Sequence, residues 1–426
     1  MSSLRRVAIL GGVRIPFCRN NTAYFDVGNL GLSTIVLGGL VEKFQLQGQT
    51  LGEVAMGAVL KHSSDFNLSR EATLSSGLSP HTPGITMQRA CGTGLDSLIT
   101  VANKIAVGQI EVGAGGGSDT TSDVPISVGK KMRRRLLNLN RAKTLGERIK
   151  AAIKGFSFSE FKPEFPGVAE PRTGKSMGES CEDMAKTWQI ARADQDQLAF
   201  DSHQKAAAAY ARGFYSDLVM PFRDLEKDNI LRADTTIEKL ASLKPAFDKR
   251  SGKGTLTAGN STNLSDGASV ALLSSEQWAQ DNNKEIQAYL VDAQVAAVDF
   301  VGGDGLLMAP AWAVAQLLKR NNLSLQDFDF YEIHEAFAAQ VLCTLKAWES
   351  DEFCKEKLGM SGALGSIDRS KLNVVGSSLA LGHPFAATGA RIVATAAKLL
   401  KEKGQGRVLI SICTAGGMGV AAIVER

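Results

Sequence analysis

The sequence is poor in the features that mark secreted, metal-binding or membrane proteins. Its 426 residues include only six cysteines and five histidines. No two cysteines form a Cys-x-x-Cys pair, which excludes zinc-ribbon and thioredoxin-like motifs. No apolar run approaches the roughly 20 residues of a membrane-spanning helix, and the short run at 7–11 does not suit a secretory signal. We therefore expect a cytoplasmic protein with reduced thiols.

Charge is low overall and unevenly distributed. The net charge is +4, with 22% charged and 44% hydrophobic residues, which is typical of globular chains and does not favour nucleic-acid binding. Residues 130–154 hold ten Lys or Arg residues against one acid, Glu147, with leucines and isoleucines between them. Such a basic amphipathic segment suits an anionic membrane surface, an acidic partner or an anionic ligand. A solvated basic loop is an equally good interpretation.

The order of apolar segments indicates an α/β fold in which one unit occurs twice. A helix, a polar turn and a strand follow one another at 32–59 and again at 311–333. A helix that opens at a reactive residue, followed by a strand that ends in glycines, occurs at 91–117 and again at 383–417. These pairs predict a layered α/β fold with buried strands, built from two copies of one α/β unit.

The duplication divides the chain into an N-terminal half, 1–280, and a C-terminal half, 281–426. A chain of this length also favours more than one packed unit. The first half contains an inserted loop domain at about 120–250, which is unlike the rest and includes the basic segment.

Cys91 is the leading candidate for a nucleophile. It lies in the run Gln88-Arg-Ala-Cys-Gly-Thr-Gly94, at a predicted strand-to-helix turn. Free N–H groups and the helix dipole at such a turn are expected to lower the pKa of the thiol. The flanking glycines are expected to leave room for a bulky substrate. Many buried cysteines are inert, so this run alone does not identify a nucleophile.

Three further runs carry groups that suit acyl transfer. His383, between a glycine and a proline at a predicted helix start, is a candidate base for Cys91, with a structural cap as the alternative. Cys413 ends a strand before a glycine-rich turn. The N–H groups of this turn are candidates to stabilise an oxyanion, and the alternative is a turn that merely requires the backbone angles of glycine. His334 and Glu335 follow a strand, the usual place for site residues in α/β sheets, although an exposed loop is the alternative. The run lacks the second histidine of a zinc motif, so no metal site is expected.

These runs resemble the signature set of the thiolases. Cys91 in a Cys-x-x-Gly turn, His-Glu-Ala-Phe-Ala at 334–338, Gly-His-Pro-Phe-Ala-Ala-Thr-Gly at 382–389 and Cys-Thr-Ala-Gly-Gly-Met-Gly at 413–419 follow the family's order and spacing. A fifth run, 257–267, is similar to the family's stretch near the pantetheine of CoA. The likeness covers nearly the whole chain. It implies a thiolase-like α/β fold of two duplicated layered αβα units, stacked as αβαβα.

Several positions depart from the usual family pattern. Most thiolases have Asn where this chain has His334, and glycine where it has Ala386 and Ala415. The family's Asn holds a water that completes an oxyanion hole, so His334 must perform this task differently. Ala415 can still donate its backbone N–H. The forms of these motifs, with the basic insertion, resemble the thiolase (β) subunits of bacterial and mitochondrial fatty-acid oxidation complexes.

The resemblance implies CoA-dependent thiolysis of 3-ketoacyl-CoA to acyl-CoA and acetyl-CoA in fatty-acid β-oxidation, reversible as a Claisen condensation. Cys91, deprotonated by His383, would carry the acyl group, and Cys413 would protonate the acetyl-CoA enolate. His383 and a water near His334 would stabilise the enolate oxygen, and the N–H groups of Cys91 and Ala415 the second oxyanion. CoA is a substrate, and no cofactor is expected. The alternative is a short-chain acetyl-CoA acetyltransferase that works in the condensing direction.

The remaining site candidates have supporting roles. Glu335 is expected to orient its neighbours rather than to act as an acid. Ser176 stands where some family members have a histidine near the adenine, so that contact is not transferred to this chain. The substrate-binding candidates, with core packing as the alternative for the last three, are Ser261, Thr262, Met177, Met308 and Phe337.

The resemblance also bears on partners and on rival functions. It implies a homodimer or homotetramer. For the basic segment 130–154 we predict docking to a membrane surface, as a peripheral contact, or to a partner hydratase/dehydrogenase subunit. A decarboxylating condensing enzyme of the ketoacyl synthase type is one rival, but it would not use a second thiol such as Cys413. A thiolase-like lipid carrier without catalysis is another, but it would not need Cys91, His383 and Cys413 together.

Overall fold

The structure is a computed structural model that describes residues 4–426. Its N-terminal half builds a layered α/β unit from strands and helices that alternate along the chain. In chain order these are β1 (Val7–Arg14), β2 (Cys18–Arg19), α1 (Asn29–Phe44), β3 (Glu53–Gly57), α2 (Leu68–Ser75), β4 (Gly84–Thr86), α3 (Thr93–Ala106), β5 (Val112–Asp119) and β8 (Ser265–Ser275).

The C-terminal half builds a second unit of the same kind, and a short helix, α9 (Glu276–Asp281), joins the two. Its elements are β9 (Ala288–Ala297), α10 (Ala309–Asn321), β10 (Phe330–Ile333), α11 (Ala338–Glu349), α12 (Asp351–Glu356), α13 (Ser378–Leu381), α14 (Thr388–Lys403), β11 (Arg407–Thr414) and β12 (Met418–Glu425).

The strands form one mixed sheet in the order β10-β11-β12-β9-β1-β8-β5-β3-β4, with β2 paired to β8 at the side. Within this sheet, the strand series β1-β8-β5-β3 and β9-β12-β11-β10 have the same arrangement. The helices correspond as well: α1 follows β1 as α10 follows β9, and α3 precedes β5 as α14 precedes β11. The last two strands of each series are parallel, and β1 meets β9 antiparallel where the series join. The predicted duplication is confirmed.

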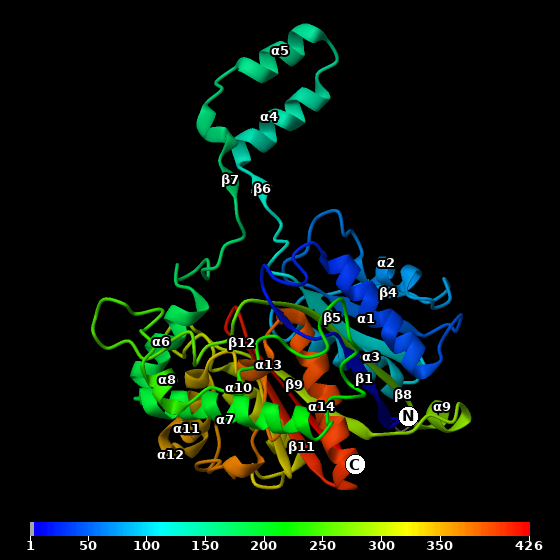
Figure 1. Cartoon of the computed structure of the whole chain (residues 1–426), viewed down its shortest axis with the longest axis vertical. Coiled ribbons are helices and arrows are strands. Elements are labelled where there is room, and N and C mark those ends of the chain that lie inside the picture. The colour runs from blue at the N-terminus through cyan, green and yellow to red at the C-terminus, as the bar shows by residue number, and fades with distance from the viewer. Residues whose placement is uncertain (1–3) are drawn as a thin grey trace.

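Side chains on successive strand positions point to opposite faces, which creates separate apolar layers. Val7 and Ile9 pack toward α3 and α14, whereas Ala8 and Leu10 pack toward α1. Strands of both halves contribute to the cluster around α3 and α14, so these two helices lie between the halves. Helices α1 and α2 cover one outer face, and α10 and α11 the other (Figure 1). The predicted αβαβα layering is confirmed.

Residues 120–264 lie between β5 and β8 and form the inserted region. Helices α6 (Met177–Thr187), α7 (Arg192–Ala211) and α8 (Ile237–Ala241) belong to it, and α6 and α7 pack on α11. The stretch 127–164, here called the arm, consists of β6 (Ser127–Val128), α4 (Lys130–Arg141), α5 (Leu145–Ile153), a 3-10 turn (Phe158–Phe161) and β7 (Pro163–Glu164). Figure 1 shows the arm projecting away from the body on the β6–β7 stem.

The arm has its own internal structure. Thr144 and Glu147 form a capping box at the start of α5, which satisfies free N–H groups there. Arg135 makes a bidentate pair with Glu160 at 2.8 and 2.9 Å and also donates to three carbonyl groups at the end of α5. Few apolar side chains take part: Met132 is the buried residue of α4, and every residue of α5 is at least partly exposed. Across residues 4–426, no helix has the length and apolar character needed to cross a membrane.

Candidate active site

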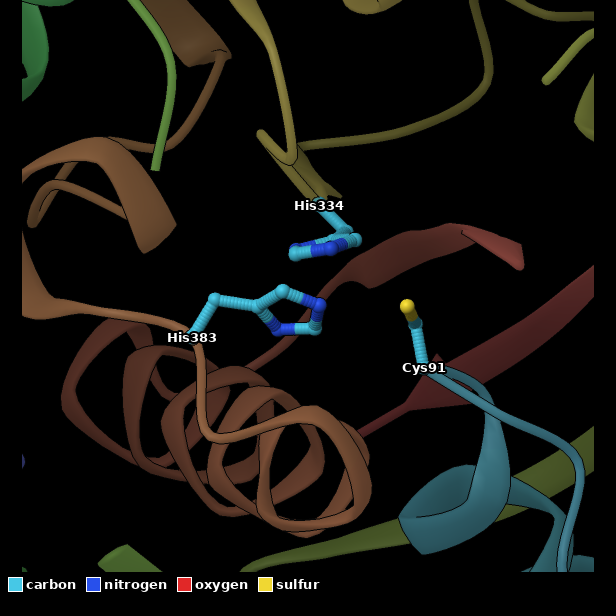
Figure 2. Close-up of side chains that lie close together, drawn as sticks. All are labelled: Cys91, His334 and His383. Atoms are coloured by element: carbon cyan, nitrogen blue, oxygen red, sulfur yellow. The ribbon is translucent and has the colours of Figure 1, made fainter. Parts of the chain in front are cut away.

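Three side chains from different parts of the chain meet between the two halves. Cys91 precedes α3, His334 directly follows β10, and His383 precedes a 3-10 turn that leads into α14. Figure 2 shows the three side chains pointing toward one another. The residue before the cysteine, Ala90, has a φ of +43°, an unusual conformation for a non-glycine residue that turns the chain sharply at the nucleophile.

The reactive atoms of the three side chains lie close together. The sulfur of Cys91 and one ring nitrogen each of His334 and His383 all lie within 4.8 Å of one another. The two imidazole rings have centroids 4.1 Å apart and planes inclined by 49°. Cys91 is 9% exposed, His383 4% and His334 0%, so the cluster is largely shielded from solvent.

Glycines bring the nucleophile and the base together by close packing. A Cβ atom on Gly94 would lie 2.5 Å from the carbonyl oxygen of Ala386, and one on Gly389 would lie 2.0 Å from the nitrogen of Leu95. The first turns of α3 and α14 therefore touch through their backbones. The sequence-based expectation that glycines beside Cys91 leave room for substrate is wrong for Gly94, whose free side is filled by the His383 loop.

Burial determines the protonation of the pair. It raises the pKa of Cys91 to about 12, although the backbone N–H of Ala415 opposes this rise. Burial, assisted by the positive charge of Arg391, lowers the pKa of His383 to about 3. The predicted lowering of the Cys91 pKa is therefore wrong, because desolvation of a thiolate outweighs the N–H groups at the helix start. The pair rests as a neutral thiol and a neutral imidazole.

Cys413 supplies a second thiol beside the first. It lies near the end of β11, opposite Gly419 of β12, and is 1% exposed. Burial and the proximity of Cys91 both raise its pKa well above the ordinary value. The turn after it, 415–417, presents the N–H of Ala415 to Cys91, and Gly416 donates its N–H to Glu170 of the inserted region at 2.8 Å.

Each histidine has one nitrogen fixed and one nitrogen free. Nδ1 of His383 pairs with Oγ1 of Thr388 at 2.6 Å, and Nδ1 of His334 pairs with Oγ of Ser378 at 2.8 Å. Both Nε2 atoms are buried and have no protein partner within residues 4–426. Two buried, unpaired nitrogens beside a thiol form a site that can accept or donate protons to a reacting group. The sequence predicted that His383 begins a helix. In the structure, His383 lies five residues before Thr388, the first residue of α14.

Glu335 lies behind the histidines and holds several elements together. Its carboxylate accepts hydrogen bonds from Ser202 of α7 at 2.8 Å, from Asn373 at 2.6 Å and from the N–H of Leu379 at 3.2 Å. Burial raises its pKa, and these three donors oppose the rise. The contacts are those of an orienting group, which supports the role expected for Glu335.

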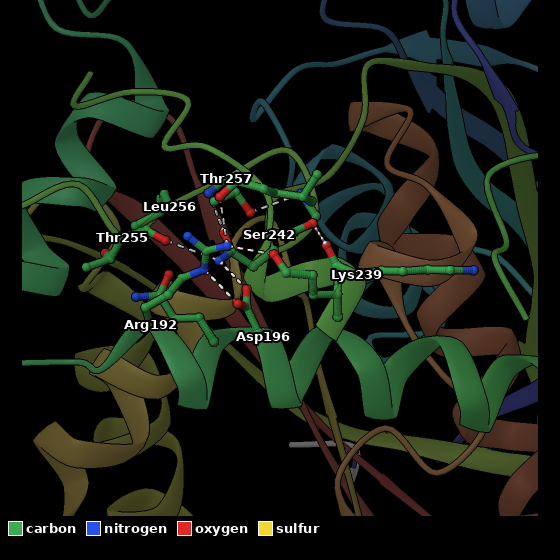
Figure 3. A network of polar contacts seen from close by, with 12 residues as sticks. Arg192, Asp196, Lys239, Ser242, Thr255, Leu256 and Thr257 are labelled. Carbon is green, nitrogen blue, oxygen red and sulfur yellow. Dashed lines mark hydrogen bonds and ion pairs between the residues drawn. The ribbon is translucent and has the colours of Figure 1, made fainter. Parts of the chain in front are cut away.

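A polar network fixes the stretch that contains Ser261 and Thr262. Arg192 pairs with Asp196 on α7 at 2.7 Å, and Asp196 accepts from Asn260 at 2.9 Å (Figure 3). Thr262 then bonds the carbonyl of Ala336 through its N–H and its hydroxyl, at 3.0 and 3.1 Å. The stretch is thereby attached two residues from His334.

The substrate-binding candidates fall into two groups. The hydroxyl of Ser261 is buried without a partner within residues 4–426, so it is free to contact a ligand group. Phe337 is 9% exposed and packs edge-on against Phe247, with ring centroids 5.9 Å apart. Met308 is fully buried in the core, and Met177 packs against the same cluster, which favours packing roles for both.

Ser176 has a structural task. Its hydroxyl and the Glu179 side chain form a capping box at the start of α6. Helix capping is therefore sufficient to explain why a serine occupies this position.

Sequence reasoning missed four buried polar residues around the site. Asp119, at the end of β5, accepts N–H groups from Val59, Leu60 and Ala386, and burial raises its pKa to about 7. It thereby links the first half to the loop that follows His383. Its position at the end of a glycine-rich strand was a usable signal. The others, which only three-dimensional contacts reveal, are Glu332, Ser378 and Arg391.

Cys91, His334 and His383 are also of the residue types that bind metals such as zinc. A nucleophile and its base also need to lie this close together, so the spacing alone does not distinguish a metal site from a catalytic pair. The absence of a metal, expected from the sequence, remains a prediction.

Comparisons with known proteins agree with this geometry. The family model described as "Thiolase, N-terminal domain" matches residues 7–277, and "Thiolase, C-terminal domain" matches 284–426. A protein of Vibrio cholerae named 3-ketoacyl-CoA thiolase is 41% identical over 426 residues, covering 99% of this chain and 97% of that protein. A protein of the same name from Yersinia enterocolitica is 40% identical with the same coverage.

A solved structure shows the same fold. The acetyl-CoA acetyltransferase of Bacillus anthracis superposes with a TM-score of 0.81 over 100% of both chains, at 31% sequence identity. The family models together span nearly all of the described residues, and the relatives are similar over their whole length. This protein is therefore an acyltransferase that belongs to the thiolase family.

Proposed function

We propose that the chain is a 3-ketoacyl-CoA thiolase, which cleaves 3-ketoacyl-CoA with free CoA to give acyl-CoA and acetyl-CoA. The observation that carries this proposal is the buried cluster of Cys91, His334 and His383, with a second thiol, Cys413, beside Cys91. A single thiol with a base is sufficient for many acyl transfers. A second thiol beside it suits a reaction in which a carbon atom must also gain or lose a proton.

In the first half-reaction, His383 takes the proton of Cys91 as the sulfur attacks the keto carbon of the substrate. The neutral resting pair means that charge appears only when the substrate is bound. The bond between the α-carbon and the keto carbon then breaks, which leaves the acyl group on Cys91 and an acetyl-CoA enolate. His334 and His383 stabilise the enolate oxygen, and Cys413 gives its proton to the enolate carbon. Acetyl-CoA leaves.

In the second half-reaction, CoA enters and Cys413 takes the proton of its thiol. The CoA sulfur attacks the thioester on Cys91, and the backbone N–H groups of Cys91 and Ala415 hold the oxyanion. The N–H of Ala415 already faces the Cys91 sulfur, which supports this assignment. Acyl-CoA leaves, and the proton on His383 returns to Cys91. Loss of one such donor typically reduces the rate by about 10²–10³-fold.

The test is a thiolysis assay with acetoacetyl-CoA and longer 3-ketoacyl-CoAs of graded chain length, each with and without free CoA. We expect loss of the 3-ketoacyl-CoA only when CoA is present, and an acyl adduct on Cys91 by mass spectrometry. No loss at any chain length would rule out the thiolase proposal. We also propose that the reaction needs no metal or other cofactor, so a chelator should leave the rate unchanged.

A short-chain acetyl-CoA acetyltransferase acting in the condensing direction is the second candidate. The solved structure of that name superposes on this chain, but at 31% identity. Relatives at 40–41% identity carry the name 3-ketoacyl-CoA thiolase. A preference for substrates longer than acetoacetyl-CoA in the graded series would separate the two.

For the arm we propose peripheral docking onto an anionic membrane, in the setting of fatty-acid β-oxidation. Its exposed side chains include Leu136, Leu145, Ile153 and Phe158, the last 84% exposed, among many Lys and Arg residues. Exposed apolar side chains flanked by cationic side chains suit a lipid surface that offers both an apolar interior and anionic headgroups. A hydratase/dehydrogenase subunit with an acidic face is the alternative partner.

Co-sedimentation with vesicles that contain anionic lipid, and with neutral vesicles, tests the arm. We expect binding to the anionic vesicles that weakens as salt is added. Capture of a hydratase/dehydrogenase subunit without vesicle binding would instead support the protein partner. Absence of both at low salt would leave a solvated arm.

We further propose a cytoplasmic homodimer or homotetramer. The support is the family membership together with the sequence composition described above. Light scattering after size-exclusion chromatography measures the mass in solution, and a monomer would contradict the proposal.

A further inference from the structure

Arg391 of α14 lies behind the catalytic histidines, and its hydrogen bonds go to two neighbouring serines. Nη2 donates to Oγ of Ser378 at 2.8 Å, and Nη1 donates to Oγ of Ser377 at 3.3 Å. Arg391 is 2% exposed and both serines are fully buried. A buried arginine with this arrangement fixes the direction of the hydrogen bonds around it.

A guanidinium group donates and never accepts, so Oγ of Ser378 must accept from Arg391. The single hydrogen of the Ser378 hydroxyl then needs an acceptor. Within residues 4–426, the other hydrogen-bond partner of this oxygen is Nδ1 of His334, at 2.8 Å. If the hydroxyl donates to Nδ1, both bonds are satisfied. If Nδ1 carried a hydrogen instead, the hydroxyl hydrogen would be buried without an acceptor, which is unfavourable.

A neutral imidazole has one N–H group. With Nδ1 as an acceptor, the hydrogen of His334 lies on Nε2, the buried atom that has no protein partner in the described chain. We infer that Ser378 and Arg391 are positioning residues that hold His334 in the tautomer with an N–H on Nε2, directed at the reacting atoms. This inference rests on the proposed thiolysis, in which His334 stabilises the enolate oxygen.

The second histidine has a different environment. Nδ1 of His383 pairs with Oγ1 of Thr388 at 2.6 Å, and within residues 4–426 no arginine donates to that hydroxyl, so the direction of this bond is not fixed in the same way. An N–H on Nδ1 leaves a lone pair on Nε2, as a base for Cys91 requires. As the base of the proposed thiolysis, His383 would present this lone pair beside the N–H of His334. His334 is a donor where most of the family has Asn, and Ser378 and Arg391 supply the constraint that makes it one.

A double-mutant cycle between Ser378 and His334 tests the inference. Ser378→Ala should lower kcat about 10-fold with KM unchanged within about twofold, since the lost donor acts on developing charge. In a His334→Asn background, Ser378→Ala should change kcat less than about twofold, because an Asn side chain has no tautomer to fix. Ser378→Cys keeps the size but weakens the donor, so it should give an intermediate loss.

Ser377→Ala is the matched control, because Ser377 also accepts from Arg391 but does not touch His334. It should change kcat less than about twofold. Equal losses from Ser377→Ala and Ser378→Ala, or an undiminished effect of Ser378→Ala in the His334→Asn background, would overturn the inference. Thermal unfolding of each variant separates loss of fold from loss of the tautomer. Absence of thiolysis in the wild-type chain would instead contradict the proposed function.

Discussion

The two halves of the molecule share a chain path but contribute different chemistry. In the first half, the connection from β3 to α3 provides one reactive group, Cys91. The corresponding connection in the second half, from β10 to α14, provides both His334 and His383. In the first half, strands β5 and β8 are separated by the inserted residues 120–264. The corresponding strands of the second half, β11 and β12, are joined by the three-residue turn 415–417, beside Cys413.

The comparison teaches how a duplicated unit can build an asymmetric site. Because α3 and α14 are equivalent helices, the duplication places their first turns side by side at the join between the halves. Gly94 and Gly389 allow the two backbones to touch there. Once this contact exists, a nucleophile on one copy needs only an acid and a base on the other. The insertion leaves this contact unchanged and adds support from outside it, as when Ser202 of α7 donates to Glu335.

Replacement of the nucleophile should have the largest effect. Cys91→Ala removes the one reactive side chain supplied by the first half, and thiolysis should fall by at least about 10⁴-fold. Steady-state kinetics and mass spectrometry check this together, because the acyl adduct should disappear as well. Retained turnover with an adduct elsewhere would show that the second half alone carries the chemistry.

Cys413→Ala should have the next largest effect. Thiolysis should fall by about 10²–10³-fold through loss of the proton donor and acceptor, while an acyl adduct on Cys91 should still form from acyl-CoA. Cys343→Ala is the matched control, because Cys343 of α11 is a fully buried thiol of the same half. A control variant with an equal loss would assign the effect to packing rather than to proton transfer.

Gly94→Ala tests the contact between the halves. The added methyl group would collide with the carbonyl of Ala386, so the variant should lose about 1–3 kcal/mol of stability. It should also lose about 10-fold or more in kcat as the base shifts. Gly146→Ala, on α5 of the arm, is the control, since a Cβ there meets no atom within 4 Å. Thermal unfolding and kinetics of both variants decide whether the contact matters.

The pH dependence of stability should show the burial of His383. Its pKa falls from 6.5 to about 3 on folding, so its contribution is present above about pH 6.5 and is lost as the pH falls toward 3. His383→Ala should therefore lose less stability than the wild type between about pH 7 and pH 5. Unfolding temperatures at the two pH values measure this. Equal losses would mean that His383 is not buried in its neutral form.

Removal of the arm should have the smallest effect on turnover. Replacement of 130–154 by a short Gly-Ser linker should leave kcat within about twofold, because the arm buries little against the body. The same variant should lose binding to anionic vesicles. A large fall in kcat would show that the arm shapes the active site, in contrast to its separate position in Figure 1.

Local sequence patterns were sufficient to predict the family, the duplication and the candidate reactive residues. Cys91, His383, Cys413 and His334 lie in short runs whose residue order is readable without a structure, and the repeated helix–strand order follows from local apolar patterns. These features depend on neighbours along the chain. Prediction from sequence failed where residues distant in the chain interact, as for the crowded side of Gly94.

The electrostatics of the site, in contrast, depend on tertiary packing. Whether the Cys91 thiol is charged depends on how much solvent the surrounding layers exclude, and this burial outweighed the local helix start that the sequence suggested. The link from Arg391 through Ser378 to His334 joins residues 13 and 44 positions apart and has no local pattern. Burial and the direction of hydrogen bonds arise from packing between elements, so they appear only when the two halves are folded together.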